Sequence, residues 1–211
     1  MALVTAGMLA TVVGCSSDGY DTGDGRYSYL RADFCMAHIT GAKTVDYIVT
    51  DAGDSVRLSR LATASWLPAK DTLCRALAYY DKSSQEIFSL SQVLVAQPLA
   101  KMSLDSVATD PLTIESAWKG GGFLNIGIAV KSGSSDEMDA RQAIGIMADS
   151  VYADGDTIRT VRLRLLHAQN GVPEYYTTKT YISMPIPAAW KHAILTVCAK
   201  GYSGEQLLTA K

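Results

Sequence analysis

The sequence predicts an all-β protein, with a small five-stranded OB-like barrel followed by a β-sandwich domain. After residue 27, short apolar segments alternate with turns, and almost none of them has the 3.6-residue period of an amphipathic helix. The turns are marked by closely spaced glycine, asparagine and aspartate residues. With 211 residues, of which 48% are hydrophobic, the chain is long enough for two domains that each bury a core.

The N-terminal segment 1–15 has the order of a bacterial lipoprotein signal: an apolar run, the small Gly14 and then Cys15. The apolar run is too short to cross about 30 Å of hydrocarbon as a helix. We therefore expect cleavage before Cys15, a lipid on its thiol, and a flexible polar tether over residues 16–26. No Lys or Arg precedes Arg26, although export signals normally open with positive charge. Either translation starts upstream of Met1, or the segment is a buried strand or helix that contains a cysteine.

Five strands are expected in the first domain, residues 27–103. They cover residues 27–39, 44–50, 55–61, 72–80 and 86–97. Five strands in about 70 residues are typical of a partly closed Greek-key barrel of the OB type, and the strand count also fits an SH3-like barrel. The segment 62–70 contains Trp66 and lies where such barrels often place a short helix.

Residues 98–111 interrupt this pattern with two prolines and a mostly polar connector, so we place the domain boundary between residues 103 and 104. Six strands are expected in the second domain, residues 104–211. They cover residues 112–118, 123–130, 142–147, 157–167, 174–184 and 193–199. Regular strands of this length, separated by glycine-containing turns, indicate a β-sandwich.

The strand 157–167 shows the expected two-faced pattern. Val161, Leu163 and Leu165 alternate with Arg162 and Arg164. Because successive side chains of a strand point to opposite faces, the apolar residues are predicted to face the core and the arginines the solvent.

The chain has four cysteines. With Cys15 assigned to the lipid, Cys35, Cys74 and Cys198 show no Cys-x-x-Cys spacing, which argues against a zinc or redox site. In an oxidising envelope Cys35 and Cys74 could form a disulfide if their strands are neighbours. The alternative is that all three are reduced and act as small hydrophobic residues.

The sequence contains no recognisable catalytic motif. The Gly-x-Ser-x-Gly string of α/β-hydrolases is absent, and the glycines at 120–122 lack the Gly-Lys-Ser or Gly-Lys-Thr of a phosphate loop, so they predict a turn. His38, His167 and His192 are isolated, without the His-x-x-x-His spacing of a zinc site. We expect no catalytic residues, no metal and no cofactor. The alternative is an envelope hydrolase whose site assembles only in three dimensions.

Partners are expected at a membrane and in the envelope rather than among nucleic acids. The net charge is −2 and the Lys and Arg residues are scattered, so the basic patch of a nucleic-acid-binding protein is missing. The remaining candidates are a membrane, reached through the lipid anchor, and an unknown protein, peptide or glycan ligand. Trp66, Tyr79 and Tyr80 are candidates for an aromatic platform, since OB barrels bind oligosaccharides. The alternative for Trp66 is that it closes one end of the barrel.

Two segments of the second domain have a distinctive sequence. The first consists of Asp-Pro-Leu-Thr-Ile at 110–114, Trp118, Gly121 and Phe-Leu-Asn-Ile at 123–126. The second consists of Leu-Arg-Leu-Leu-His at 163–167, Asn-Gly-Val-Pro at 170–173 and Tyr-Tyr at 175–176. Both segments resemble the NigD-like family of bacterial lipoproteins. The lipid cysteine, the acidic tether and the connector are similar too, so the resemblance covers most of the chain.

The resemblance implies an N-terminal OB-like domain, a C-terminal β-sandwich and anchoring in the envelope of Gram-negative anaerobes of the gut and mouth. It implies no known reaction, and the family name comes from a gene neighbourhood linked to bacteriocin production. Leu166 and Ala168 stand where the family usually has a basic and a polar residue, which weakens any role for that hairpin beyond its turn.

We therefore expect a lipoprotein of the cell envelope, held in the outer membrane on its periplasmic side or at the cell surface, with a non-enzymatic binding role. A bacteriocin-associated role in immunity or export is a further alternative.

Overall fold

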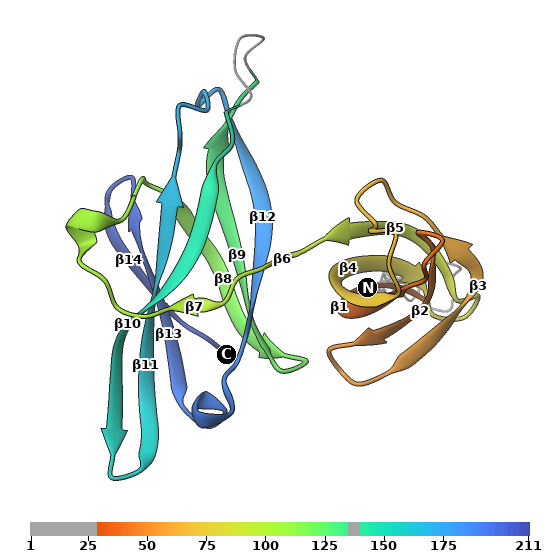
Figure 1. The fold of residues 1–211 in the computed structure, drawn as a ribbon, viewed down its shortest axis with the longest axis horizontal. Helices are drawn as coiled ribbons and strands as arrows, with labels where there is room; N and C mark the ends of the chain where they lie inside the picture. Colours follow the sequence, from red (N-terminus) through yellow and green to blue (C-terminus); the bar gives the residue numbers. More distant parts are fainter. Residues whose placement is uncertain (1–28, 135–139) are drawn as a thin grey trace, which may run out of the picture.

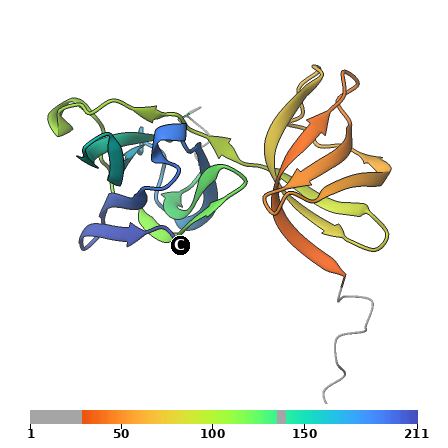
Figure 2. The same cartoon turned by 90° about the horizontal axis from the view of Figure 1, so that it is seen from below.

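The computed structural model describes residues 29–134 and 140–211, which form two all-β domains joined by an extended stretch of chain (Figure 1). The predicted all-β class is confirmed. A view turned by 90° shows the two domains as bodies that lie side by side (Figure 2). Cys15 and the predicted signal and tether, residues 1–15 and 16–26, lie outside the described residues.

The first domain is one curled antiparallel sheet. Its strands are β1 (Leu30–Ile39), β2 (Val45–Thr50), β3 (Ser55–Ala62), β4 (Thr72–Asp81) and β5 (Glu86–Gln92). Their order in the sheet is β3-β2-β1-β4-β5. The Ser59 N–H donates to the Gln85 carbonyl at 3.1 Å, which brings β3 next to the start of β5. The sheet thereby curls into the predicted partly closed barrel.

Alternate residues of β1 and β4 fill this barrel, as strand geometry requires. The inward-facing residues of these two strands are Cys35, Ala37, Ile39, Ala76, Ala78 and Tyr80, all with at most 1% exposure. The segment after β3 forms turns instead of the predicted short helix. Pro68 disfavours helical backbone at the preceding residue, Leu67, whose side chain is buried in the barrel.

The second domain is a sandwich of two sheets. Its own strands are β8 (Thr113–Gly120), β9 (Phe123–Ser132), β10 (Ala143–Asp154), β11 (Thr157–Ala168), β12 (Tyr176–Pro185), β13 (Ile194–Gly201) and β14 (Gly204–Thr209). The six predicted strands are present, and β14 was not predicted. Its adjacent Leu207 and Leu208 break the alternation that marks a strand, and Leu207 is 58% exposed.

The β11 strand confirms one half of the predicted alternation. Val161, Leu163 and Leu165 are buried in the core between the two sheets. Arg162 is partly exposed, but the side chain of Arg164 is only 10% exposed. Arg164 therefore does not belong to a solvent-facing stripe, because it is covered by Glu205.

The chain passes from barrel to sandwich earlier than predicted. Two short strands follow β5: β6 (Leu94–Val95) and β7 (Pro98–Leu99). The first pairs in parallel with β12 and the second in parallel with β10, so each adds an edge strand to one of the sandwich sheets. The expected single strand 86–97 thus changes partners near residue 93, about ten residues before the predicted boundary. The change falls within the apolar run 93–96, whose sequence gives no sign that the chain passes to another sheet.

Two short 3₁₀ helices, η1 (Leu104–Ser106) and η2 (Ala188–Trp190), lie in connections of the second domain. Over the ranges that the structure describes, no helix has the length and apolar character needed to cross a membrane.

Candidate functional site

The barrel and the sandwich are joined through one buried arginine. Arg75, on the outer face of β4, is 3% exposed and binds both carboxylate oxygens of Asp51 at 2.5 and 2.6 Å. Its remaining bonds cross to the sandwich, to the Asn125 side-chain oxygen at 2.9 Å and to the Ser183 hydroxyl at 3.1 Å. Asn125 also donates to Asp51 at 3.1 Å. A bidentate, charge-assisted pair of this kind fixes direction as well as distance. We call these four residues the interdomain network.

Two glycines in the β8–β9 hairpin make room for Asp51. A β-carbon on Gly121 would lie 2.2 Å from a carboxylate oxygen of Asp51, and one on Gly120 would lie 2.8 Å from the other. Gly121 also has a positive φ of 57°, which residues other than glycine rarely adopt. The predicted turn at 120–122 is therefore also a point at which the sandwich packs closely against Asp51 of the barrel.

Aromatic rings pack beside the interdomain network. Phe34, from β1 of the barrel, makes edge contacts with Trp118 at 5.2 Å and Tyr181 at 5.1 Å between ring centroids. The guanidinium of Arg75 lies 4.3 Å from the centroid of the Phe123 ring, within the range of a cation–π interaction. Polar and aromatic contacts from both domains thus meet at one junction.

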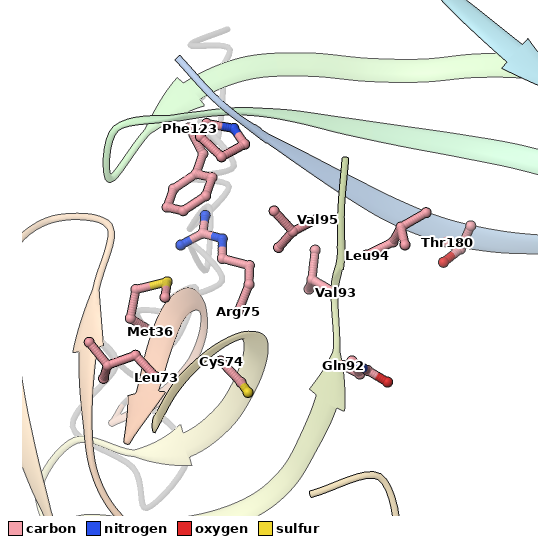
Figure 3. Close-up of a pocket in the computed structure, with 11 residues that line it drawn as sticks. Met36, Leu73, Cys74, Arg75, Gln92, Val93, Leu94, Val95, Phe123 and Thr180 are labelled. Carbon is pink, nitrogen blue, oxygen red and sulfur yellow. The ribbon is translucent and has the colours of Figure 1, made fainter. Parts of the chain in front are cut away.

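A groove opens beside this junction and has walls from both domains (Figure 3). It encloses about 650 Å³. Its lining consists of Met36, Leu73, Cys74, Arg75, Gln92, Val93, Leu94, Val95, Phe123, Thr180 and Pro185. Several of the apolar residues are well exposed, including Leu73 at 49%, Leu94 at 47% and Val95 at 44%. We call this cavity the junction groove.

The structure does not gather the predicted aromatic platform. Tyr80 points into the barrel, where it is 1% exposed and donates to Asp33 at 2.9 Å, and burial raises the pKa of Tyr80 to about 12. Its neighbour Tyr79 points outwards and packs against Phe88. Trp66 packs against the barrel core and donates from its indole nitrogen to the Leu90 carbonyl at 3.1 Å. Adjacent strand residues face opposite sides, so Tyr79 and Tyr80 cannot share one surface.

The cysteines that were candidates for a disulfide are free thiols. Cys35 pairs with Ala76 and Cys74 with Ala37, so the two cysteines are diagonal neighbours on adjacent strands. Diagonal Cα atoms lie about 7–8 Å apart, beyond the usual reach of a disulfide. Burial raises the pKa of Cys35 to about 12, and the half-buried Cys74 lies in the wall of the junction groove. Cys198 is buried in the sandwich.

No histidine lines the junction groove, although His38 is the cross-strand partner of its wall residue Leu73. His38 contacts two carboxylates, Asp46 at 2.6 Å and Asp71 at 3.3 Å. His167 is buried, with its Nδ1 within 3.3 Å of the carbonyl oxygens of residues 110 and 111. In the described part of the chain, no group of three or more His, Cys, Asp and Glu residues is placed to hold a metal ion.

Sequence reasoning missed the residues of the interdomain network. Arg75 and Ser183 are 108 positions apart, and no local pattern joins them. The sequence nevertheless contained a signal, because Arg75 and Asn125 each interrupt a run of apolar residues within a predicted strand. Buried polar side chains require partners, so such residues mark contacts that the strand's own sheet does not supply.

The fold is also found in proteins of known structure. No protein-family model matches the chain, and no curated protein is similar to it. A NigD-like immunity protein from Bacteroides caccae is 18% identical, with a TM-score of 0.62 over 85% of this chain and 90% of that one. A protein from Parabacteroides distasonis described as toxin related is 19% identical, with a TM-score of 0.63 over 85% of this chain and 91% of that one.

A third structure, of a protein of unknown function from Bacteroides vulgatus, is 13% identical, with a TM-score of 0.61 over 85% of this chain and 89% of that one. At these identities the likeness concerns the fold. The predicted resemblance is confirmed at that level: this chain has the two-domain, all-β fold of a NigD-like protein.

Proposed function

We propose that this chain is a non-enzymatic binding protein of the bacterial cell envelope and that it holds its partner in the junction groove. The observation that carries the proposal is a groove whose walls come from two domains fixed to each other by the interdomain network. Ligand sites are typically concave, mostly apolar, largely preformed and frequent at domain boundaries.

The lining of the groove favours a neutral, largely apolar partner. Arg75 is its one formally charged residue, and Asp51 neutralises it through a bidentate pair. An anionic ligand would have to displace this carboxylate, which would leave a buried charge without its partner. The exposed Leu73, Leu94 and Val95 offer apolar surface instead.

The same lining supports binding rather than catalysis. Its residues include no histidine or carboxylate side chain that could act as a general acid or base. Cys74 is the strongest nucleophile among them, and burial raises the pKa of its thiol. An activated cysteine has the opposite shift, towards the thiolate.

A groove-directed capture experiment tests the proposal. The full chain, its Val95→Asp variant and its Val151→Asp variant would each be immobilised and exposed to envelope extracts and to a glycan panel. Val151 is a matched control, because it is 47% exposed and lies on β10, away from the groove. We expect one partner to be captured by the parent chain and by Val151→Asp, but not by Val95→Asp. Capture of the same partner by the parent chain and by both variants would overturn the proposal.

Anchoring in the envelope is part of the proposal and depends on Cys15. The order of apolar run, Gly14, Cys15 and polar tether supports it. We expect radiolabelled palmitate to enter the parent chain and not the Cys15→Ser variant, which should also leave the membrane fraction. Equal membrane sedimentation of both proteins without label would contradict the anchor.

Bacteriocin immunity is a second candidate function, favoured by the neighbours described as an immunity protein and as toxin related. Expression of the chain in a bacteriocin-sensitive strain should then protect it. Protection should be lost in Val95→Asp and kept in Val151→Asp if the junction groove is the site of action.

A further inference from the structure

We infer, on the basis of the proposed function, that the partner of the junction groove is an extended peptide segment that adds as a strand to the free end of β4. The segment would continue the β4–β5 ladder beyond the point at which the chain itself leaves it.

The groove lies where an antiparallel strand pair comes apart. The register of β4 with β5 ends at the pair Ala76 and Gln92. One further bond, from the Val93 N–H to the Arg75 carbonyl at 3.1 Å, follows it. The chain then turns to β12, where Leu94 pairs with Ile182. Residues 73 and 74 of β4 therefore face a groove in which the described chain places no next strand of the ladder.

The backbone of β4 is oriented to receive such a strand. In an extended strand, the backbone N–H and C=O groups of alternate residues point to the same side. The Arg75 carbonyl points towards β5, because it accepts from Val93. The N–H and C=O of Leu73 consequently point to the same side, into the groove. An edge of this kind is what β-augmentation uses, with main-chain bonds giving affinity and side-chain pockets giving specificity.

The walls of the groove define the side chains of the segment. Met36 and Leu73 lie on the barrel side, Leu94 and Val95 on the crossing chain, and Phe123 on the sandwich (Figure 3). An added strand would direct every second side chain onto these apolar walls. Since the charge of Arg75 is already neutralised, the matching segment has apolar residues at alternate positions and no charge between them.

A peptide fits this lining better than a glycan does. Sugars are commonly held by exposed aromatic rings, and Phe123 is the one aromatic residue of the lining. The guanidinium of Arg75 already lies over its ring at 4.3 Å from the centroid. A backbone edge flanked by aliphatic side chains remains available, and a peptide is complementary to both.

The first step of the test is a selection from a displayed library of random peptides of about nine residues, roughly 30 Å when extended. The full chain serves as bait, and binders that also bind Val95→Asp are removed. Leu73→Asp provides a second groove variant, and Val151→Asp the matched control. We expect the selected peptides to alternate apolar and uncharged polar residues, and to slow alkylation of Cys74 by N-ethylmaleimide.

The second step replaces the amide hydrogens of one selected peptide by methyl groups, one position at a time. Leu73 is the one residue of β4 shown to offer a free N–H and C=O on this side, so methylation of the single amide that donates to its carbonyl should weaken binding about tenfold or more. Methylation at the two neighbouring positions, whose amides point away from β4, should change it by less than about threefold.

The strand inference would be overturned by groove-dependent peptides that lack alternating apolar residues, or that lack one methylation-sensitive amide between two tolerant positions. The proposed binding function would remain intact. Failure to select any groove-dependent peptide would also overturn the strand inference. The proposed function is decided separately by the capture experiment, in which a glycan bound by the groove would support binding and exclude the peptide strand.

Discussion

Asp51 reaches the sandwich because residue 121 has no side chain. In Gly121→Ala the new methyl group would strike the Asp51 carboxylate, and the residue would also be strained at its φ of 57°. Gly155 is a matched control, because its φ is 59° and a β-carbon there meets nothing within 4 Å. We expect Gly155→Ala to lower the free energy of unfolding by about 1 kcal/mol, the cost of the backbone alone. Gly121→Ala should cost at least about 2 kcal/mol more, because it also displaces the partner of Arg75.

Urea unfolding of the two variants measures this difference. Equal losses would show that the close approach of Asp51 to the hairpin contributes nothing to stability.

His38 gives the barrel a pH-dependent contact. Its hydrogen bond with Asp46 raises the pKa of His38 and lowers the pKa of Asp46. The stabilisation from His38 is therefore complete below its ordinary pKa of about 6.5 and is lost as the pH rises through the raised value. The stabilisation from Asp46 is present above the ordinary aspartate pKa of about 3.9, and it is lost as the pH falls through the lowered pKa.

We therefore expect His38→Gln to be more destabilising at a pH of about 5.5 than at a pH of about 9. Urea unfolding at both pH values checks this. The control is His192→Gln, because His192 is exposed, and this variant should change the free energy of unfolding by the same small amount at both pH values. A pH-independent loss in His38→Gln would rule out the proposed protonation of this contact.

At the scale of the element, one side chain joins the two sheets at the edge formed by β14. The Ile114 N–H donates to the Gln206 side-chain oxygen at 2.9 Å, and the Gln206 amide donates to the Leu112 carbonyl at 3.1 Å. Gln206→Ala leaves both backbone groups unpaired, and we expect a loss of about 1–3 kcal/mol in the free energy of unfolding. Thr209→Val, on the same strand, is exposed and should change it by less than about 0.5 kcal/mol. Chemical denaturation of the two variants measures these changes, and equal losses of unfolding free energy would contradict a bridging role for Gln206.

Strands could be predicted from the sequence wherever their alternation is complete, as in β11 with Val161, Leu163 and Leu165. Prediction failed where the alternation is broken, as at Leu207 and Leu208 of β14. Prediction also failed at Arg164, because the sequence of its own strand does not indicate that Glu205, 41 positions away on another strand, covers the Arg164 side chain. Alternation describes the two faces of a strand, whereas burial depends on what packs against each face.

At the scale of the whole molecule, the interdomain network couples two domains that each have a core. Arg75→Met leaves the Asp51 carboxylate without its cation, and removal of one member of a buried pair typically costs about 3–5 kcal/mol. We expect this variant to unfold in two steps, with the barrel and the sandwich separated, whereas the parent chain unfolds in one. Hydrogen exchange at increasing urea, resolved by mass spectrometry, follows each domain.

Arg60→Met is the control for this prediction. The Arg60 side chain is 83% exposed and lies 3.7 Å from Glu86, so its loss should cost less than about 1 kcal/mol and leave one transition. If Arg75→Met also unfolds in one step with a similar midpoint, the network does not couple the domains.

The junction groove could not be predicted from the sequence, because it depends on how the two domains dock. Leu73 and Val95 belong to strands that were predicted, yet the cavity between them exists because the chain changes partners at Val93. Arg75 was visible in the sequence as a polar residue that interrupts an apolar run within a predicted strand. Its partner Asn125 was visible for the same reason, and only the fold shows that they meet.

The two short strands that follow the barrel have a consequence for inheritance. Because β6 and β7 complete opposite sheets of the sandwich, residues 94–99 are structurally part of a domain whose other strands begin at Thr113. A recombination breakpoint between Leu99 and Thr113 would remove the edge strand of both sheets, and the exposed edges of β12 and β10 would favour aggregation. Selection should therefore keep residues 94–99 together with the sandwich, and breakpoints between relatives that exchange one domain should fall before Leu94.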